Sequence, residues 1–358
     1  MAAQAELTDA VTFSKAPPTE TVAVVDSLAP EDTDRVETEL GVVESYLETD
    51  LVDTSGHGSI VLERIQNWGC FERYDFYQII DKNGLYRDGD LAAAIDDAHQ
   101  NGADIINVSA ACDHMSKGWK ECSPQRQPCN VCQTVSDVVE SGTTVVAAAG
   151  NSFQLDVMGC PGLTDAAICV GAAVANCTAE PTPPQTTPPH SDAEWRPPGA
   201  YYLVDGHESG LEGTYCSMEG CGPGKRCSEN KLVKYSEVNV AEVNGKPDVL
   251  APSHVLVVRD DEPAISEGTS WAAPFVTGQL GSVVSGLLDA GVQVVDETKR
   301  TGGGTNLHHM LKSHGREVDD CGSEIYNGYR ILADVEANTP VTFERREPSV
   351  NVVRDDRY

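Results

Sequence analysis

The sequence contains no long uninterrupted run of apolar residues. A membrane-spanning helix needs about 18 such residues in succession, and no stretch comes near that length. The opening residues, Met-Ala-Ala-Gln-Ala-Glu-Leu, have neither a basic nor an apolar segment, so they do not have the pattern of a signal peptide. We therefore expect a chain that does not enter a membrane. Its compartment stays open: inside the cell as written, outside if this is a processed form.

Basic residues are also scarce, with 25 against 56 acidic ones and a formal net charge of −31. Such a charge repels nucleic acid and anionic membranes, so we expect neither as a partner. Self-repulsion would strain the folded chain at low ionic strength, whereas molar salt shortens the screening length to about 3 Å. We expect a halophilic protein with an acidic surface. The alternative is an ordinary acidic secreted protein.

What the chain does contain is the run Gly-Thr-Ser-Trp-Ala-Ala-Pro at residues 268–274, which leads into an apolar segment with a helical pattern. Ser270 would then stand at the start of a helix. The unpaired N–H groups there favour developing negative charge, which suits a serine nucleophile. The alternative is that Thr269 or Ser270 only caps the helix.

This run resembles the serine motif of the subtilisin-like serine peptidases, the subtilases, whose pattern is Gly-Thr-Ser-x-Ala-x-Pro. In that family an aspartate and then a histidine precede the serine in the chain. Asp26 follows the apolar run at residues 21–25 and resembles the family's aspartate, although Leu28 stands where the family has glycine. Without the resemblance, Asp26 would be read as the start of a turn.

The candidate histidine is His57, which lies between two glycines ahead of a helical apolar pattern. It resembles the His-Gly-Thr motif of the family, with Ser59 in the threonine position. The family's small residues in the following helix are replaced by Leu62, Glu63 and Arg64. A lone histidine is more often structural than catalytic, but its separation from Asp26 is close to that of the family. The resemblance implies a catalytic triad of Asp26, His57 and Ser270.

Two further segments carry the resemblance. Residues 143–151 end in Ala-Ala-Gly-Asn, which implies that the Asn151 amide stabilises the oxyanion of the tetrahedral intermediate. Residues 105–111 resemble the strand that pairs with an extended substrate. Without the resemblance, Asn151 would be a turn residue and the strand simply part of the core. The substrate-binding residues implied are Ser109, Ala110, Ala111, Ala148 and Gly150.

Strand and helix patterns alternate along the chain. We predict strands at 21–25, 74–80, 103–109, 143–151 and 166–174, and helices at 90–100 and 134–141. Such alternation favours right-handed crossovers in an α/β fold. With the resemblance, the expected architecture is a three-layer subtilisin-like fold with a mainly parallel central sheet. The acidic stretch 30–50 is expected to be a solvated face.

The predicted organisation is an N-terminal arm at 1–20, a subtilase catalytic domain at 21–340 and a polar tail at 341–358. The domain contains an insertion at about 177–240 that is rich in cysteine, proline and glycine. Long loops of this kind are usually functional or disordered. Its cysteines favour an ordered flap near the substrate cleft.

Twelve cysteines form the last notable feature. Their number favours disulfides, with structural zinc and buried thiols as alternatives. Cys129 and Cys132 have one metal-type spacing, but structural zinc usually needs two such pairs, so no metal ligands are predicted. Catalysis is expected to need no cofactor. The resemblance allows a structural calcium ion, for which the sequence gives no ligand set.

These observations together predict a serine endopeptidase that acts through an acyl-enzyme intermediate. We expect a polypeptide substrate and a monomeric chain. Two alternatives stay open, because fold alone does not establish activity. One is a catalytically silent peptide-binding scaffold with a subtilase fold. The other is a processing protease of narrow specificity whose flap admits one partner.

Overall fold

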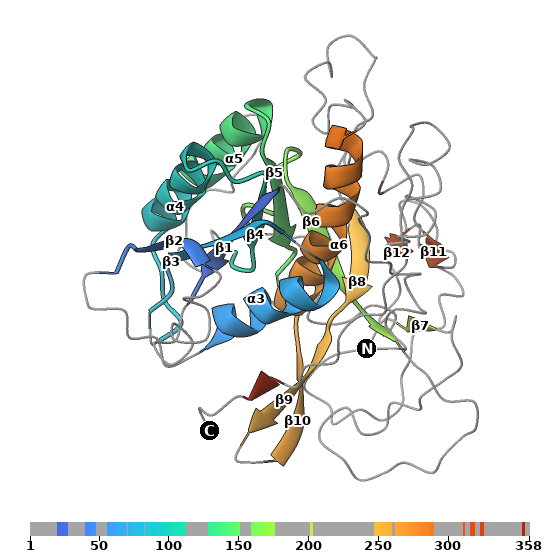
Figure 1. Cartoon of the computed structure of the whole chain (residues 1–358). Coiled ribbons are helices and arrows are strands. Elements are labelled where there is room, and N and C mark those ends of the chain that lie inside the picture. Colours follow the sequence, from blue (N-terminus) through green and yellow to red (C-terminus); the bar gives the residue numbers. More distant parts are fainter. Residues whose placement is uncertain are drawn as a thin grey trace, which may run out of the picture.

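The structure of the protein is a computed structural model of the 358-residue chain (Figure 1). The residues that it describes are 20–27, 40–47, 56–69, 71–81, 83–111, 128–150, 159–175, 201–202, 247–259, 262–289, 311, 316–318, 323–325 and 353–354.

A large, mainly parallel sheet forms the centre of the molecule. Seven neighbouring strands run parallel, in the order β2, β3, β1, β4, β5, β6, β8, and β12 continues the parallel pairing. They are β2 (Leu40–Ser45), β3 (Arg73–Gln78), β1 (Thr21–Asp26), β4 (Ile105–Val108), β5 (Thr144–Ala148), β6 (Ile168–Ala175), β8 (Val249–Pro252) and β12 (Ser323–Ile325). Two short strands, β7 (Tyr201–Tyr202) and β11 (Arg316–Val318), join antiparallel.

Helices cover both faces of this sheet (Figure 1). One face carries α3 (His57–Trp68) and α6 (Thr269–Asp289), and the other carries α4 (Asp88–Gln100) and α5 (Asn130–Glu140). The strands are apolar on both sides: in β1, Val22 and Val24 pack towards α3 and α6, whereas Ala23 and Val25 pack towards α4 and α5. Strands buried on both faces are typical of parallel sheets. The predicted three-layer α/β architecture with a mainly parallel central sheet is confirmed.

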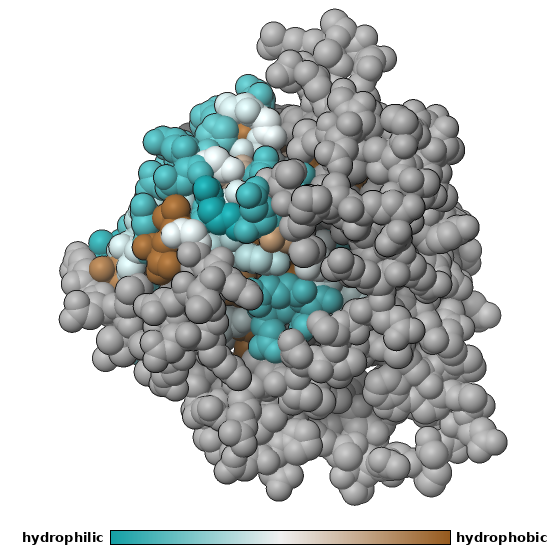
Figure 2. Space-filling view, in the orientation of Figure 1, coloured by the Kyte–Doolittle hydropathy of each residue, from teal (hydrophilic) through white to brown (hydrophobic). Residues whose placement is uncertain are grey.

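The outer sides of α4 and α5 face solvent, and Figure 2 shows a mainly hydrophilic surface in the region of these two helices. On α6, by contrast, every residue from Thr269 to Gly281 is buried. A helix that is apolar all round belongs in a core. Within the described residues, no helix is both long enough and apolar enough to cross a membrane.

The predicted elements differ from the observed ones mainly at their ends. The helix expected at 134–141 is α5, which begins four residues earlier, at Asn130, with the Cys129 sulfur accepting a hydrogen bond from the Cys132 N–H. A cysteine is an unusual cap, so the usual start signals were absent. The acidic stretch contains the exposed edge strand β2, which agrees with a solvated face but adds a strand that the charge pattern concealed.

A second, three-stranded sheet was not predicted. Strands β9 (His254–Arg259) and β10 (Glu262–Glu267) form a hairpin immediately before α6, and β13 (Val353–Arg354) pairs with β9. The tail predicted at 341–358 thus contributes at least one short strand. The arm at 1–20 lies outside the described residues except for buried Glu20, and so does the insertion at 177–240 except for β7. These domain boundaries stay predictions.

Helices α3 and α6 meet at two glycines. A Cβ atom on Gly69, at the end of α3, would lie 2.1 Å from the backbone oxygen of Gly278 in α6. No real Cβ contact is that short, so the two backbones could not approach this closely if Gly69 were any other residue. This contact sets the distance between the helices that begin with His57 and Thr269.

We predict that Gly69→Ala lowers the free energy of unfolding by about 2–3 kcal/mol, because the added methyl group meets backbone that cannot rotate away. The matched control is Gly89→Ala on the exposed side of α4, where a Cβ meets nothing within 4 Å. That change should be neutral or slightly stabilising, since alanine favours helices. Urea unfolding of both variants is the measurement, and equal stabilities would contradict the packing argument.

Candidate active site

Asp26 is the last residue of β1, at the carboxyl edge of the parallel sheet where open α/β folds place their ligands. Its side chain is fully buried. The Oδ1 atom accepts a hydrogen bond from the Ser27 N–H at 2.7 Å and lies 2.7 Å from Nδ1 of His57. A buried carboxylate needs such partners. The two residues that the sequence placed 31 positions apart are thus in direct contact.

His57 is the first residue of α3, and the preceding Gly56 has φ 55°, in the left-handed region that favours glycine. The next residue, Gly58, donates its N–H to the Ser27 hydroxyl at 3.2 Å, and a Cβ atom on Gly58 would lie only 1.8 Å from the Ser27 carbonyl oxygen. The pair of glycines thus lets α3 begin directly against the end of β1. The His57 side chain remains 29 % exposed, so one edge of the ring can meet a ligand.

Ser270 is the second residue of α6, so the predicted position at a helix start is confirmed. It is 9 % exposed. The next residue, Trp271, packs its indole against the His57 imidazole with ring centroids 4.7 Å apart. The starts of α3 and α6 therefore meet, and Ser270 directly precedes the residue that contacts His57.

Two reciprocal hydrogen bonds join Ser270 to Ser109, which directly follows β4. The Ser270 hydroxyl donates to the Ser109 carbonyl oxygen at 3.1 Å, and the Ser109 hydroxyl donates to the Ser270 carbonyl oxygen at 3.1 Å. Behind them, the Asn107 amide donates to the Ser109 hydroxyl at 3.0 Å and accepts from the Thr277 hydroxyl at 2.9 Å. This buried polar network connects β4 with two turns of α6, and sequence reasoning missed it.

The end of β5 is tied to the same helix. The Gly150 N–H donates to the Thr269 hydroxyl at 3.1 Å, and Gly150 has φ 109°. The Thr269 hydroxyl thus accepts a hydrogen bond from the segment that follows β5, and the alternative that Thr269 caps its own helix stays a prediction. Asn151, predicted to bind the oxyanion, lies outside the described residues. Its neighbour Gly150 is thereby fixed beside the start of α6.

The remaining predicted substrate-binding residues lie at the same sheet edge. Ala148 is the last residue of β5, while Ala110 and Ala111 follow β4. Ala110 is buried and Ala111 is partly exposed. The Tyr86 hydroxyl donates a hydrogen bond to the Ala111 carbonyl oxygen. The Ala111 carbonyl oxygen, which belongs to the strand predicted to pair with a substrate, therefore already accepts a hydrogen bond from within the protein.

Arg64, noted in the sequence only as a departure from the family pattern, is a buried cation between the two helices. Its Nε donates to the Trp271 carbonyl oxygen, and its Nη2 donates to the Pro252 carbonyl oxygen at 2.6 Å. The guanidinium also lies 5.6 Å from the centre of the Phe275 ring. Burial lowers the pKa of Arg64 to about 9, so the side chain is charged at neutral pH. It clamps α3 to the first turn of α6.

Among the described residues, the cysteines do not form the disulfides that their number favoured. Cys129, Cys132, Cys160 and Cys169 are thiols, and no disulfide joins any two of these four. All but Cys129 are buried. Burial lets a cysteine behave as a small apolar side chain, so an even count alone does not predict pairing. The other eight cysteines lie outside the described residues.

The family model of the subtilase family matches residues 72–300, a range that includes Ser109 and Ser270 and begins after Asp26 and His57. No curated protein matches the chain.

Several solved structures are similar over almost their whole length. An alanine mutant of the protease domain of PatA matches with a TM-score of 0.56 and 16 % identity, covering 91 % of this chain and 99 % of that one. A lanthipeptide protease matches with a TM-score of 0.54 and 16 % identity, covering 93 % and 95 %. The prenylagaramide maturation protease PagA gives 0.54 and 16 %, covering 90 % and 95 %. At such identities the likeness shows the fold.

We predict that Arg64→Met lowers the free energy of unfolding by about 2–4 kcal/mol, because two buried carbonyl oxygens lose their donor and each such loss costs about 1–3 kcal/mol. Arg64→Lys should recover only part of the loss, since one ammonium group cannot reproduce the planar fork. The exposed Arg87 provides the matched control, and Arg87→Met should change stability by no more than about 0.5 kcal/mol. Denaturant unfolding measures the stability of all three variants. An Arg64→Met variant with an unchanged free energy of unfolding would contradict the role of Arg64 in holding α3 to α6.

Proposed function

We propose, since the chain belongs to the subtilase family of peptidases, that it is a serine endopeptidase with Asp26, His57 and Ser270 as its catalytic triad. The observation that carries the proposal is the 2.7 Å contact between Asp26 Oδ1 and His57 Nδ1, and it is supported by the packing of His57 against Trp271, the residue after Ser270. The order of the three residues along the chain is the one expected of the family.

The proposed reaction begins when Ser270 Oγ attacks the carbonyl carbon of the scissile peptide bond. His57 Nε2 takes the hydroxyl proton and then delivers it to the leaving amine, which breaks the C–N bond and leaves an acyl-enzyme. A water molecule, deprotonated by the same imidazole, then hydrolyses the ester and restores Ser270. The Ser270 hydroxyl, now directed at the Ser109 carbonyl, has to turn towards the imidazole for the first step.

Asp26 acts through His57. Its Oδ1 favours the tautomer with the proton on Nδ1, which leaves Nε2 as the base. The carboxylate also stabilises the imidazolium, because a positive ring at the N-terminus of α3 would otherwise be disfavoured by the helix dipole. Burial of the carboxylate strengthens this interaction, since water does not screen it.

Oxyanion stabilisation is proposed to come from the Asn151 side chain and the Ser270 N–H. Both donors would act at the start of α6, where helix N–H groups are unpaired and negative charge is favoured. The hydrogen bond from the Gly150 N–H to Thr269 supports this assignment, because it holds the residue before Asn151 against that helix start.

An extended polypeptide is the proposed substrate, bound alongside residues 109–111 with its scissile carbonyl near Ser270. Ala110, Ala111, Ala148 and Gly150 have small or no side chains, which leaves room for a backbone to approach. Backbone pairing gives affinity with little sequence preference.

A narrower role in peptide maturation is the second candidate. It is favoured by the solved structures that resemble the whole chain, which include a lanthipeptide protease and a prenylagaramide maturation protease. On this hypothesis the chain cuts one class of precursor peptide. Cleavage of a denatured protein, compared with cleavage of short peptides, separates the two roles: broad digestion supports a general endopeptidase, and resistance of the denatured protein supports a processing enzyme.

We predict that a fluorophosphonate probe labels the purified protein at Ser270, and that Ser270→Ala and His57→Ala both abolish rapid labelling. An ordinary serine hydroxyl does not react, so labelling reports an activated nucleophile. Ser141→Ala is the matched control, because Ser141 lies at the exposed end of α5 and should leave labelling unchanged. Mass spectrometry of the adduct identifies the site.

Absence of labelling in well-folded protein would contradict the endopeptidase proposal and leave the silent peptide-binding scaffold in its place. The labelling is run in dilute buffer and in molar salt, because the halophilic expectation is still a prediction. Faster labelling in molar salt supports it, since screening relieves the repulsion of a chain with net charge −31. Equal rates favour an ordinary acidic protein.

A further inference from the structure

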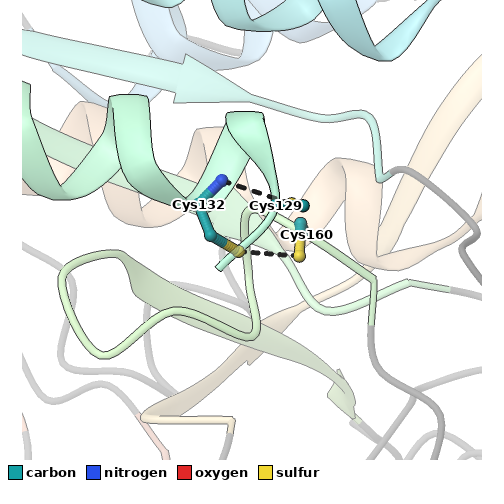
Figure 3. A group of neighbouring side chains, drawn as sticks. All are labelled: Cys129, Cys132 and Cys160. Atoms are coloured by element: carbon teal, nitrogen blue, oxygen red, sulfur yellow. Dashed lines mark hydrogen bonds between the residues drawn. The ribbon is translucent and has the colours of Figure 1, made fainter. Parts of the chain in front are cut away.

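Three cysteine sulfur atoms converge on the α5 side of the sheet (Figure 3). Cys129 caps the N-terminus of α5, Cys132 lies in its first turn, and Cys160 comes from a separate turn ahead of β6. The three Sγ atoms all lie within 4.8 Å of one another. Cys132 and Cys160 are fully buried, and Cys129 is partly exposed.

The cluster lies at the start of a helix. The Cys132 N–H donates to the Cys129 sulfur at 3.4 Å, and both residues occupy the start of an 11-residue helix, where negative charge is stabilised. Thiolates are the form in which cysteine binds metal ions. A helix start alone does not make a metal site. Here, however, a third sulfur atom from another part of the chain lies beside it.

We propose that Cys129, Cys132 and Cys160 form a metal-binding site for a thiolate-preferring ion, with Zn²⁺ as the first choice. Tetrahedral zinc with Zn–S bonds of about 2.3 Å keeps its sulfur ligands about 3.8 Å apart, which is within the span of this cluster. The Cys132 and Cys160 sulfurs are 2.7 Å apart, so binding requires them to separate by about 1 Å. A water molecule or another ligand takes the fourth position.

The sequence pattern contains only two of the three sulfur ligands. Cys129 and Cys132 have the spacing of one zinc-binding pair, and the lack of a second pair argued against a metal. Cys160 supplies the missing sulfur across 28 residues from Cys132, a contact that only the fold creates. The metal would therefore join the start of α5 to the chain segment between β5 and β6.

This segment also touches the end of β5. A Cβ atom on Gly162, two residues after Cys160, would lie 3.0 Å from the Ala148 carbonyl oxygen. The proposed ion would stabilise the chain between β5 and β6, in which Asn151 also lies. The metal proposal itself does not depend on peptidase activity.

The test is cobalt and zinc binding by the full chain, reduced and freed of metal beforehand. We expect one Co²⁺ per chain, with the near-ultraviolet charge-transfer absorption of thiolate ligands, and displacement by Zn²⁺. Cys132→Ser and Cys160→Ser should each weaken binding by at least about tenfold and reduce the absorption. Cys169→Ser is the matched control, because Cys169 is equally buried but lies in β6 outside the cluster.

Zinc content of the unmodified protein, isolated from zinc-supplemented cells without chelator, provides a measurement that does not depend on variants. One zinc ion per chain that is released when the thiols are alkylated would support the proposal. Failure of the reduced protein to bind either ion would overturn it. So would mass-spectrometric detection of a Cys132–Cys160 disulfide in protein that carries no metal.

Discussion

The close contact between α3 and α6 is the constraint on which the site depends. Gly69 and Gly278 let the two backbones meet, and the Gln279 amide donates to the Trp68 carbonyl oxygen at 2.7 Å beside them. Elsewhere in the same interface, the Arg64 side chain donates a hydrogen bond to the carbonyl oxygen of Trp271, the residue after Ser270. Because the interface is fixed at both places, the residues that begin the two helices have little freedom to move apart.

The strand ends of the sheet position the other residues of the site. β1 ends in Asp26, and the strand ends of β4 and β5 place Ser109 and Gly150 against the first turn of α6. Each contact joins a strand end to a helix start, so the polar groups meet at one edge while the apolar faces pack elsewhere. Asp26, His57 and Ser270, the three residues of the proposed triad, therefore come from β1, α3 and α6, three elements far apart in the chain.

Much of this arrangement follows from the sequence. The apolar run before Asp26, the glycines around His57 and the apolar segment after Ser270 predicted strand ends and helix starts correctly, since each depends on local chemistry. The network through Asn107 and Thr277, the Arg64 clamp and the approach of Cys160 to Cys132 could not be predicted. They join residues between 28 and more than 200 positions apart, and no local pattern records such contacts. The β9–β10 hairpin was missed for another reason: the apolar run 255–258 and the polar residues 259–262 are a hairpin signal that stood in the sequence and was not used.

The proposed triad depends most directly on the coupling between Asp26 and His57. The measurement is the rate of fluorophosphonate labelling for Asp26→Ala, His57→Ala and the double variant. If Asp26 acts only through the imidazole, the double variant labels about as slowly as His57→Ala alone, because residues that work as a unit are not additive. Losses that multiply in the double variant would show that the two residues act independently, and would contradict the proposed triad.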